Sequence, residues 1–292
     1  FMSEMTVFGI ENCTLGENPL WNRFRNCLHY VDIDGRKLIS VDWKSKKNKV
    51  IEFSKKISSI ALCKNGSLLF AFEDGIYTDN GNLIALRPPE SGERFNDGKT
   101  SPDGNYFVGT INRKGNGNLY RLHNDKLETA LNGIYISNGI DWTNDGNRMY
   151  YCDSHTQSVA EYSYPDMQFL RTVISFDKKD GVPDGLCTDN DGFLWIALWG
   201  AGRVVRVNPT DGTIVETVNF PTPFISCPAF AGEALNTLAV TSAANRNMPN
   251  DITAGRCFSI KVNPVGKLPY EYDMPMDKIA KSDNEKEMMR SG

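Results

Sequence analysis

Short apolar stretches of four to six residues alternate with polar turns along most of the chain. Many of these turns contain Asn-Gly or Asp-Gly, and such pairs before a run of β-branched and aromatic residues favour β-hairpins. Outside the C-terminal tail, no window of about twelve residues shows the 3.6-residue periodicity of an amphipathic helix. The pattern predicts an all-β protein, with strands at Cys27–Val31, Ser67–Phe72, Tyr106–Thr110, Met149–Cys152, Phe193–Leu198 and Thr237–Thr241.

The turns recur at a nearly constant distance. Turn glycines at positions 66, 104, 146 and 192 are separated by 38, 42 and 46 residues. A turn at Asn26 lies 40 residues before the first of them, and Gly232 lies 40 residues after the last. Repeats of about 40 residues that each contain several short strands are typical of propeller blades. The spacing therefore predicts a six-bladed β-propeller.

The repeat covers most of the chain without an internal linker, so we expect a single propeller domain over residues 1–273. A strand around Thr6–Ile10 is expected to complete the last blade, because closure of the propeller removes an exposed sheet edge. Residues 274–292 are rich in charge and are expected to form a frayed tail or a short surface helix.

One polar side chain precedes several of the turns at a constant distance. Asn96, Asn138 and Asp184 each lie eight residues before a turn glycine, and Glu17 lies eight residues before Arg25 in the corresponding turn. Residues at one phase of a structural repeat occupy equivalent places, so these four side chains should converge. Two carboxylates and two amides that meet at one point are typical of a site for a hard cation.

Composition and charge narrow the class of function. The 292 residues are 40% hydrophobic, enough for a sizeable core, and the net charge of −4 argues against nucleic-acid binding. No apolar run approaches the ~18 residues of a membrane span, and the first residues lack the character of a signal peptide. The seven cysteines are scattered, without a Cys-x-x-Cys pair, which favours reduced thiols. We expect a cytoplasmic protein that is a monomer or a weak dimer.

Four motifs in matching order resemble the regucalcin and gluconolactonase family: Leu15–Trp21, Glu93–Lys99, Ile136–Trp142 and Pro183–Cys187. The resemblance covers roughly residues 13–263 and implies a six-bladed propeller with a divalent cation in its central funnel. It also implies a hydrolase that converts sugar (aldono) lactones to aldonic acids.

The resemblance further assigns roles to individual residues. It implies that Glu17, Asn138 and Asp184 hold the metal, and that Arg94 and Asn96 contact the substrate. One segment departs from the family pattern, because the loop within Gly109–Gly117 is short and lacks the glutamate that regucalcin-like members bring toward the substrate.

The chemistry follows from this set of oxygen ligands. Such a set suits Ca²⁺ or Mg²⁺ best, with Zn²⁺ and Mn²⁺ as alternatives. A metal held by three protein ligands leaves positions for water and substrate, where it would polarise a lactone carbonyl and activate the water. Asp184 is the candidate general base, since a carboxylate beside the metal can take a proton from the attacking water.

Two other functions stay open on the same fold. One is a hydrolase for organophosphates or aryl esters, and the other is a calcium-binding regulatory propeller without catalysis. Arg94 and Asn96 favour a hydroxyl-rich substrate over an apolar ester. Within the short loop, Arg113 or Lys114 offers an alternative preference for an acidic or phosphorylated sugar lactone.

Overall fold

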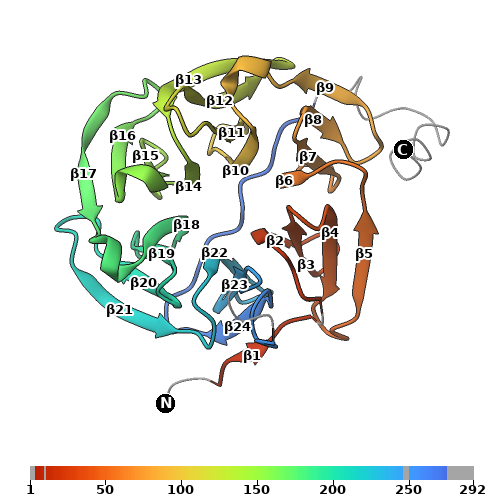
Figure 1. Cartoon of the computed structure of the whole chain (residues 1–292), viewed down its shortest axis with the longest axis vertical. Helices are drawn as coiled ribbons and strands as arrows, with labels where there is room; N and C mark the ends of the chain where they lie inside the picture. Colours follow the sequence, from red (N-terminus) through yellow and green to blue (C-terminus); the bar gives the residue numbers. More distant parts are fainter. Residues whose placement is uncertain (1–3, 10, 246–249, 275–292) are drawn as a thin grey trace.

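Six four-stranded antiparallel sheets surround a central channel in the computed structural model, which describes residues 4–9, 11–245 and 250–274 (Figure 1). In five sheets the strands follow chain order from the channel outward, and in the sixth the N-terminal strand forms the outer edge. Helical residues in these ranges are confined to three 3-10 helices, and none of these helices has the length and apolar character needed to cross a membrane. The predicted all-β, six-bladed propeller is confirmed.

Each blade is named here by the order of its inner strand in the chain. Blade 1 contains β2 (Gly16–Asn22), β3 (Cys27–Asp32), β4 (Lys37–Asp42) and β5 (Asn48–Glu52). Blade 2 contains β6 (Ile57–Leu62), β7 (Leu68–Phe72), β8 (Gly75–Thr78) and β9 (Leu83–Leu86). Blade 3 contains β10 (Arg94–Thr100), β11 (Tyr106–Ile111), β12 (Gly117–His123) and β13 (Lys126–Ile134).

The second half of the propeller repeats this arrangement. Blade 4 contains β14 (Ser137–Trp142), β15 (Arg148–Asp153), β16 (Ser158–Ser163) and β17 (Phe169–Ser175). Blade 5 contains β18 (Val182–Thr188), β19 (Leu194–Trp199), β20 (Arg203–Val207) and β21 (Ile214–Asn219). Blade 6 contains β22 (Ile225–Ala231), β23 (Thr237–Ser242), β24 (Phe258–Lys261) and β1 (Thr6–Val7). The 3-10 helices are η1 (Pro89–Ser91), η2 (Ser154–Thr156) and η3 (Lys178–Asp180).

Blade 6 combines strands from both ends of the chain. β1 pairs antiparallel with β24, in a register that sets Thr6 opposite Ser259 and Val7 opposite Phe258. This pairing supplies the fourth strand of the blade and covers an edge of β24. Ile10, at the end of the strand expected around Thr6–Ile10, lies outside the described residues, as do residues 275–292 of the predicted tail.

The glycines of the sequence repeat occupy one structural position. Gly66, Gly104, Gly146 and Gly192 lie between the first and second strands of blades 2 to 5, with φ between +71° and +83°. Each donates its backbone N–H to the carbonyl three residues earlier, at 2.8–3.0 Å. Glycine reaches this left-handed conformation without the steric penalty of a side chain, so the turn and its spacing are readable from the sequence.

Apolar side chains between neighbouring blades form the core. The second strand of a blade, such as β3 or β11, is buried along its whole length because both of its faces pack against other blades. Large side chains fill the space where the blades diverge, and Trp195 meets Phe230 of the next blade edge-to-face at 5.9 Å. The outermost strands are exposed along much of their length, as in β21. The core is thus divided into wedges, one for each pair of blades.

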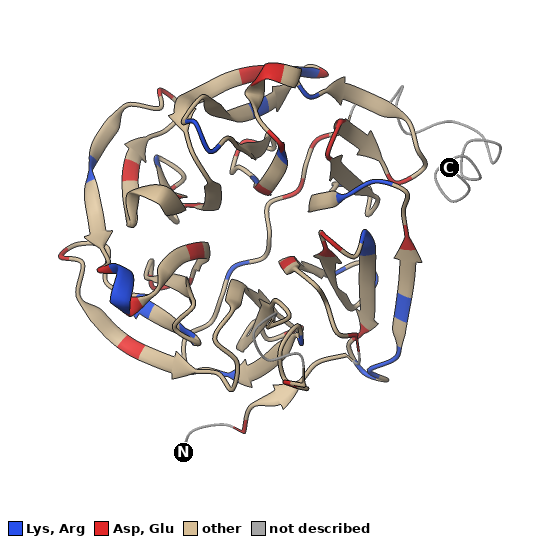
Figure 2. Ribbon diagram, in the orientation of Figure 1, with Lys and Arg blue, Asp and Glu red and all other residues tan. Residues whose placement is uncertain are grey.

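A C-terminal segment crosses one end of the central channel after β24 (Figure 1). Its backbone bonds to turns of several blades: Gly266 pairs with Asp189, Tyr272 pairs with Cys63, and the Asp273 N–H donates to the Gly104 carbonyl at 3.2 Å. Lys267 Nζ donates to the Trp142 carbonyl at 2.8 Å. In the ribbon of Figure 2, this segment carries both Lys or Arg positions and Asp or Glu positions. The segment therefore covers the end of the channel at which these turns lie.

One buried histidine makes the fold sensitive to acid. Burial, together with the nearby Arg25, lowers the pKa of His29 from its ordinary value of 6.5 to about 3. In the unfolded chain His29 binds a proton near its ordinary pKa, so its contribution to stability is complete above that value and is lost as the pH falls toward 3. Chemical denaturation at pH 7 and pH 5 should show a loss of about 2 kcal/mol from this residue.

Between pH 7 and pH 5, the free energy of unfolding should fall less in the variant His29→Gln than in the wild type, because the variant lacks the titrating group. His123→Gln, at an exposed position of the third blade, is the matched control and should follow the wild type. Identical pH profiles for His29→Gln and the wild type would contradict the assignment.

Candidate metal and substrate site

The inner strands carry a bulge at one level of the channel. The register shifts between Glu17 and Leu20 in β2, Phe95 and Gly98 in β10, Ser137 and Ile140 in β14, and Pro183 and Leu186 in β18. A bulge breaks the alternation of a strand and re-aims the side chains within it. The four residues predicted from their phase all lie at these bulges and are at most 6% exposed: Glu17, Asn96, Asn138 and Asp184.

The same level continues through blades 6 and 2, in which no site residue was predicted from the sequence. β22 shifts register between Ile225 and Pro228, which gives Ser226 the place of Asn138, and β6 shifts between Ile57 and Ser59 beside Ser58. Ser58 lies eight residues before Gly66, so the phase that selected the other residues also points to it. The level therefore holds two carboxylates, two amides and two hydroxyls; we call Glu17, Ser58, Asn96, Asn138, Asp184 and Ser226 the channel ring.

Two aspartates position the ring residues of blades 1 and 4. The carboxylate of Asp32 accepts the backbone N–H groups of Thr14 and Leu15, each at 2.9 Å. Asp153 accepts those of Tyr135 and Ile136 in the same way, also at 2.9 Å. Each pair of bonds holds the chain just before the inner strand and so sets the height of Glu17 or Asn138 in the channel.

Hydrogen bonds determine how the Asn138 amide is turned. The Ser154 hydroxyl donates to the Pro183 carbonyl at 2.6 Å, so its oxygen accepts from Asn138 Nδ2 at 2.8 Å. The other end of the amide is therefore the oxygen Asn138 Oδ1, which accepts one hydrogen bond, from Asn96 Nδ2 at 2.9 Å. An amide oxygen has two lone pairs, so Asn138 Oδ1 keeps one for a cation.

Two buried carboxylates face the same space. Burial, followed by the nearby Asp184 and Asp97, raises the pKa of Glu17 well above its ordinary value. Burial and Asp97 likewise raise the pKa of Asp184. Among the described residues, Glu17 Oε2, Asp184 Oδ1 and Ser58 Oγ are buried and have no hydrogen-bond partner. Buried polar atoms normally have partners, and carboxylates that repel one another are stabilised by a bound cation.

These observations test whether the ring fits a divalent metal. In the described part of the chain, no cluster of three His, Cys, Asp or Glu side chains has the arrangement of a metal site. The ring contains only two such residues, and its third candidate donor is the amide oxygen of Asn138. Carboxylate and amide oxygens are ligands that Ca²⁺ and Mg²⁺ accept. The unpartnered carboxylate oxygens and the orientation of Asn138 fit such an ion.

A second layer of charge lies next to the ring. Asn18 Nδ2 donates to Asp97 Oδ1 at 3.0 Å, and Lys99 Nζ lies 3.3 Å from Asp141 Oδ2 and 2.8 Å from the Leu186 carbonyl. Burial alone would raise the pKa of Asp141, but Lys99 and Lys267 outweigh it and lower that pKa. This layer connects the ring to the C-terminal segment. None of its residues was predicted from the sequence, although Asn18 and Asp97 directly follow ring residues.

Glycines next to the ring allow the inner strands to approach one another. A Cβ added to Gly139 would lie 2.6 Å from Leu186 N and 2.7 Å from the Asp184 carbonyl oxygen. Gly139 has no positive φ, so the neighbouring strand requires glycine there and the backbone conformation does not. The pair Asn138-Gly139 is thus part of a strand and not of a turn.

The substitution Gly139→Ala should destabilise the protein and disturb the site together. Overpacking against backbone costs about 1–3 kcal/mol, and the displacement would separate Asn138 from Asp184. The control is Gly133→Ala on the outer strand β13, where a Cβ meets nothing within 4 Å but φ is +75°. Urea denaturation should show a loss in both variants, whereas activity per folded molecule should fall in Gly139→Ala alone. Unchanged specific activity in Gly139→Ala would contradict this coupling.

Arg94 lies beside the ring at the start of β10. Its Nη1 donates to Asn96 Oδ1 at 2.6 Å and to the Phe95 carbonyl at 2.8 Å. Burial lowers the pKa of Arg94, against the opposite effect of Asp34, Glu17 and Glu93. Asn96 uses its Nδ2 on the Ser137 carbonyl and on Asn138. Arg94, Asn96 and Asn138 therefore form one connected chain of hydrogen bonds.

The short loop after β11 packs on Tyr135. Asn112 N–H donates to the Tyr135 carbonyl at 2.8 Å, and a Cβ on Gly115 would collide with the Tyr135 ring. That ring stacks on His155 of η2, with centroids 4.0 Å apart. Arg113 extends to Glu93 at 3.1 Å, and both side chains are more than half exposed. Lys114 lies at the exposed tip of the loop.

Comparison with known proteins identifies relatives across nearly the whole length. YvrE of Bacillus subtilis, named as a candidate sugar lactone lactonase, is 33% identical over 276 residues, which are 88% of this chain and 94% of that protein. Regucalcin of Sus scrofa is 32% identical over 287 residues, with 90% and 96% of the two chains covered.

A solved structure is also similar to this chain over nearly its whole length. Regucalcin of Agrobacterium tumefaciens, described as a calcium-binding protein, superimposes with a TM-score of 0.86 at 25% identity and covers 94% of this chain and 99% of its own. The family model for the SMP-30/gluconolactonase/LRE-like region matches residues 15–244. The protein therefore belongs to the SMP-30/gluconolactonase/LRE-like family.

Proposed function

We propose that the protein hydrolyses sugar (aldono) lactones to aldonic acids with the help of one divalent cation. The observation that carries the proposal is the pair of buried, unpartnered carboxylate oxygens of Glu17 and Asp184, at the level of an amide oxygen whose orientation is set by its hydrogen bonds. The name of the B. subtilis relative supports lactone hydrolysis, and the description of the A. tumefaciens relative supports calcium. Mg²⁺ is the next choice, and Zn²⁺ and Mn²⁺ are alternatives.

Glu17, Asn138 and Asp184 would hold the cation, and its chemistry would be to polarise the lactone carbonyl and to lower the pKa of a bound water. A carboxylate oxygen of Asp184 that does not contact the cation would receive the proton of the attacking water. Arg94 would donate to the ring oxygen or to the developing negative charge of the substrate. A substrate hydroxyl bound at Asn96 would replace one of the two hydrogen bonds that Asn96 Nδ2 donates to the Ser137 carbonyl and to Asn138 Oδ1.

Calcium binding without catalysis is the second candidate function, because the solved relative is described as a calcium-binding protein. Hydrolysis of organophosphates or aryl esters is the third, since a polarising metal would serve that reaction as well. The polar ring and Arg94 favour hydrolysis of a hydroxyl-rich substrate over hydrolysis of an apolar ester. They also favour it over calcium binding alone, which needs no substrate contacts.

The test is a panel of γ- and δ-lactones, followed through the acid released to a pH indicator, with and without a chelator. Hydrolysis that a chelator abolishes and Ca²⁺ or Mg²⁺ restores is the expected result. Paraoxon and phenyl acetate in the same assay test the ester alternative. Calcium binding by calorimetry, in the absence of turnover on every lactone and ester, would establish the non-catalytic function instead.

The short loop at Asn112–Gly117 should make the enzyme broad in specificity. It lacks the acidic side chain of the family pattern, and a missing polar partner selects strongly only in a site closed to water. We expect kcat/KM values for xylono-, arabinono-, galactono- and gluconolactone to differ by only about tenfold. A preference above about a thousandfold for one neutral lactone would contradict this, and a preference for an acidic or phosphorylated lactone would point to Arg113 or Lys114.

The remaining proposals concern the setting of the enzyme. All seven cysteines lie in the described part of the chain and are free and buried, which supports the reducing cytoplasm as its compartment. We propose a small-molecule substrate as its only partner, without nucleic acid or membrane, and a monomer or a weak dimer.

A further inference from the structure

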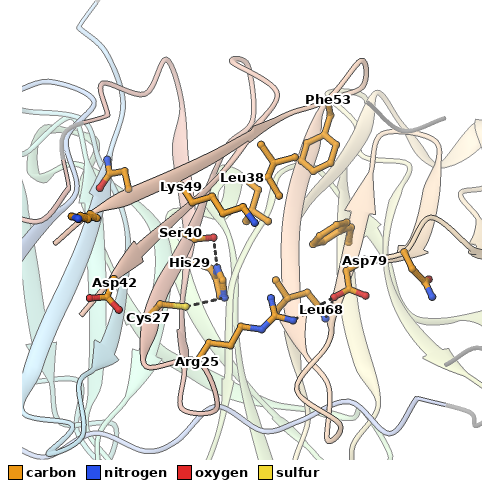
Figure 3. Close-up of a pocket in the computed structure, with 15 residues that line it drawn as sticks. Arg25, Cys27, His29, Leu38, Ser40, Asp42, Lys49, Phe53, Leu68 and Asp79 are labelled. Atoms are coloured by element: carbon orange, nitrogen blue, oxygen red, sulfur yellow. Dashed lines mark hydrogen bonds and ion pairs between the residues drawn. The ribbon is translucent and has the colours of Figure 1, made fainter. Parts of the chain in front are cut away.

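A second cavity lies between blades 1 and 2, and none of its lining residues belongs to the channel ring. Its volume is about 450 Å³, within the range of sites that bind small molecules. Figure 3 shows that side chains of the second, third and fourth strands of blade 1 face blade 2 across this space. The wedge between these blades is filled with apolar side chains near the channel. The cavity, which we call the interblade cavity, is where that filling is incomplete.

The floor of the interblade cavity is a hydrogen-bonded chain of fixed direction. Asn22 Oδ1 accepts the backbone N–H groups of Phe24 and Arg25 at 3.0 and 3.1 Å, so the other end of its amide is the donor Nδ2. Nδ2 lies 3.2 Å from His29 Nε2, which must therefore be the unprotonated nitrogen. His29 then carries its proton on Nδ1 and donates it to Ser40 Oγ at 2.7 Å.

This direction leaves the Ser40 hydroxyl with its own hydrogen to donate. Within the described residues Ser40 Oγ makes no further hydrogen bond beyond the one it accepts from His29. Ser40 is partly exposed and lines the cavity. The floor thus offers a hydrogen-bond donor to whatever occupies the cavity, and the matching ligand atom is an acceptor.

The groups around Ser40 are arranged for binding and not for catalysis. His29 cannot take the Ser40 proton, because its free lone pair is engaged by Asn22 and its Nδ1 already carries a hydrogen. Cys27 Sγ lies 3.4 Å from His29 Nε2, and burial raises the pKa of this thiol to about 11. Neither a serine nor a cysteine nucleophile is activated there.

The walls of the cavity combine apolar and cationic side chains. Leu38, Ile51, Phe53, Leu68 and Phe70 supply the apolar part, and Arg25, Lys47 and Lys49 supply positive charge. Two aspartates also line the cavity: Asp42 accepts the Ser45 N–H at 2.7 Å, and Asp79 accepts the Leu68 N–H at 3.1 Å. Asp79 also lies 4.0 Å from Arg25 and offsets its charge, so Lys47 and Lys49 are the cations that remain for a ligand. In Figure 3, Ser40 lies between Lys49 on the Leu38 side and Arg25 on the Asp79 side.

We propose that the interblade cavity binds a small amphipathic anion, a straight-chain carboxylate of medium length. The carboxylate would accept the Ser40 hydroxyl hydrogen and lie near Lys49, and the chain would lie along Leu38, Phe53 and Phe70. This site is separate from the proposed lactone site in the channel and does not depend on it.

Isothermal titration of the whole chain with decanoate, below its micelle concentration and at pH 8, tests the proposal. We expect saturable binding at one site, which weakens about threefold to fourfold for each methylene removed, down to hexanoate. Lys49→Glu should weaken binding by about tenfold or more through charge reversal, and Lys126→Glu on the outer strand β13 is the control that should not.

A second pair of variants tests the hydroxyl donor. Ser40→Ala should weaken binding of decanoate by about tenfold or more, and Ser40→Thr, which keeps the hydroxyl, should retain it. Asp184→Asn and added Ca²⁺ should leave the affinity unchanged, because the channel is a different site. The proposal is overturned by the absence of saturable binding, by equal affinity in Lys49→Glu and Lys126→Glu, by weakening in Ser40→Thr as large as in Ser40→Ala, or by loss of binding in Asp184→Asn.

Discussion

Replacing Asp184 by asparagine should lower kcat for lactone hydrolysis by about a thousandfold or more. General acid–base catalysis contributes about 10²–10⁴ to a rate, and this substitution also removes one of two negative charges that would hold the metal. Asparagine has nearly the same shape as aspartate. The backbone near the site is held by other hydrogen bonds, from the Ser154 hydroxyl to the Pro183 carbonyl and from the Thr14 N–H to Asp32, so the fold should persist. The measurement is steady-state kinetics at saturating metal, with circular dichroism to verify folding.

The matched control is Ser226→Ala, which changes a residue at the same level of the channel. Ser226 Oγ donates to the Gly16 carbonyl and shares a bond with Thr241, so it has its partners within the protein. Its loss should affect stability more than kcat. A kcat for Asp184→Asn within about tenfold of the wild type, in a folded protein with metal bound, would show that Asp184 is neither base nor essential ligand.

The double variant Glu17→Gln, Asp184→Asn should bind divalent metal more than about a thousandfold more weakly than the wild type, since ligand charge sets affinity over several orders of magnitude. The wild type should contain about one divalent ion per chain after dialysis against Ca²⁺, and the double variant almost none. Calorimetry and elemental analysis measure the two quantities. Unchanged metal content in the double variant would place the ion elsewhere.

Thermal unfolding provides an independent readout of the same pair of residues. In a chelator, the double variant should be at least as stable as the wild type, because two buried carboxylates that disfavour one another's charge have been replaced by neutral amides. With Ca²⁺ at about 100 times its dissociation constant, the wild type alone should gain about 2.7 kcal/mol. A wild type that gains nothing from Ca²⁺, Mg²⁺, Zn²⁺ or Mn²⁺ would contradict a metal site in the ring.

The bulged strands show which residues of the candidate site can be predicted from local sequence patterns. The phase of Glu17, Asn96, Asn138 and Asp184 relative to the turns is readable because each turn fixes where its inner strand ends, and the structure places all four at one level. Their roles in metal binding and catalysis stay predictions. Ser58 had the same phase but a side chain that suggested no chemistry. Ser226 did not show the phase, because Gly232 lies six residues after it and not eight.

The sequence by itself determined the strands, the 40-residue repeat and the positions of the polar residues along each repeat, because alternation and turn conformation depend on neighbours in the chain. Only the tertiary structure decided which way the Asn138 amide points, since Ser154 and Pro183 fix it across two blades. It also decided that Gly139 is needed for close packing against Leu186, that the C-terminal segment closes one end of the channel, and that a cavity remains between blades 1 and 2. These features arise from contacts between residues far apart in the sequence, which no local pattern records.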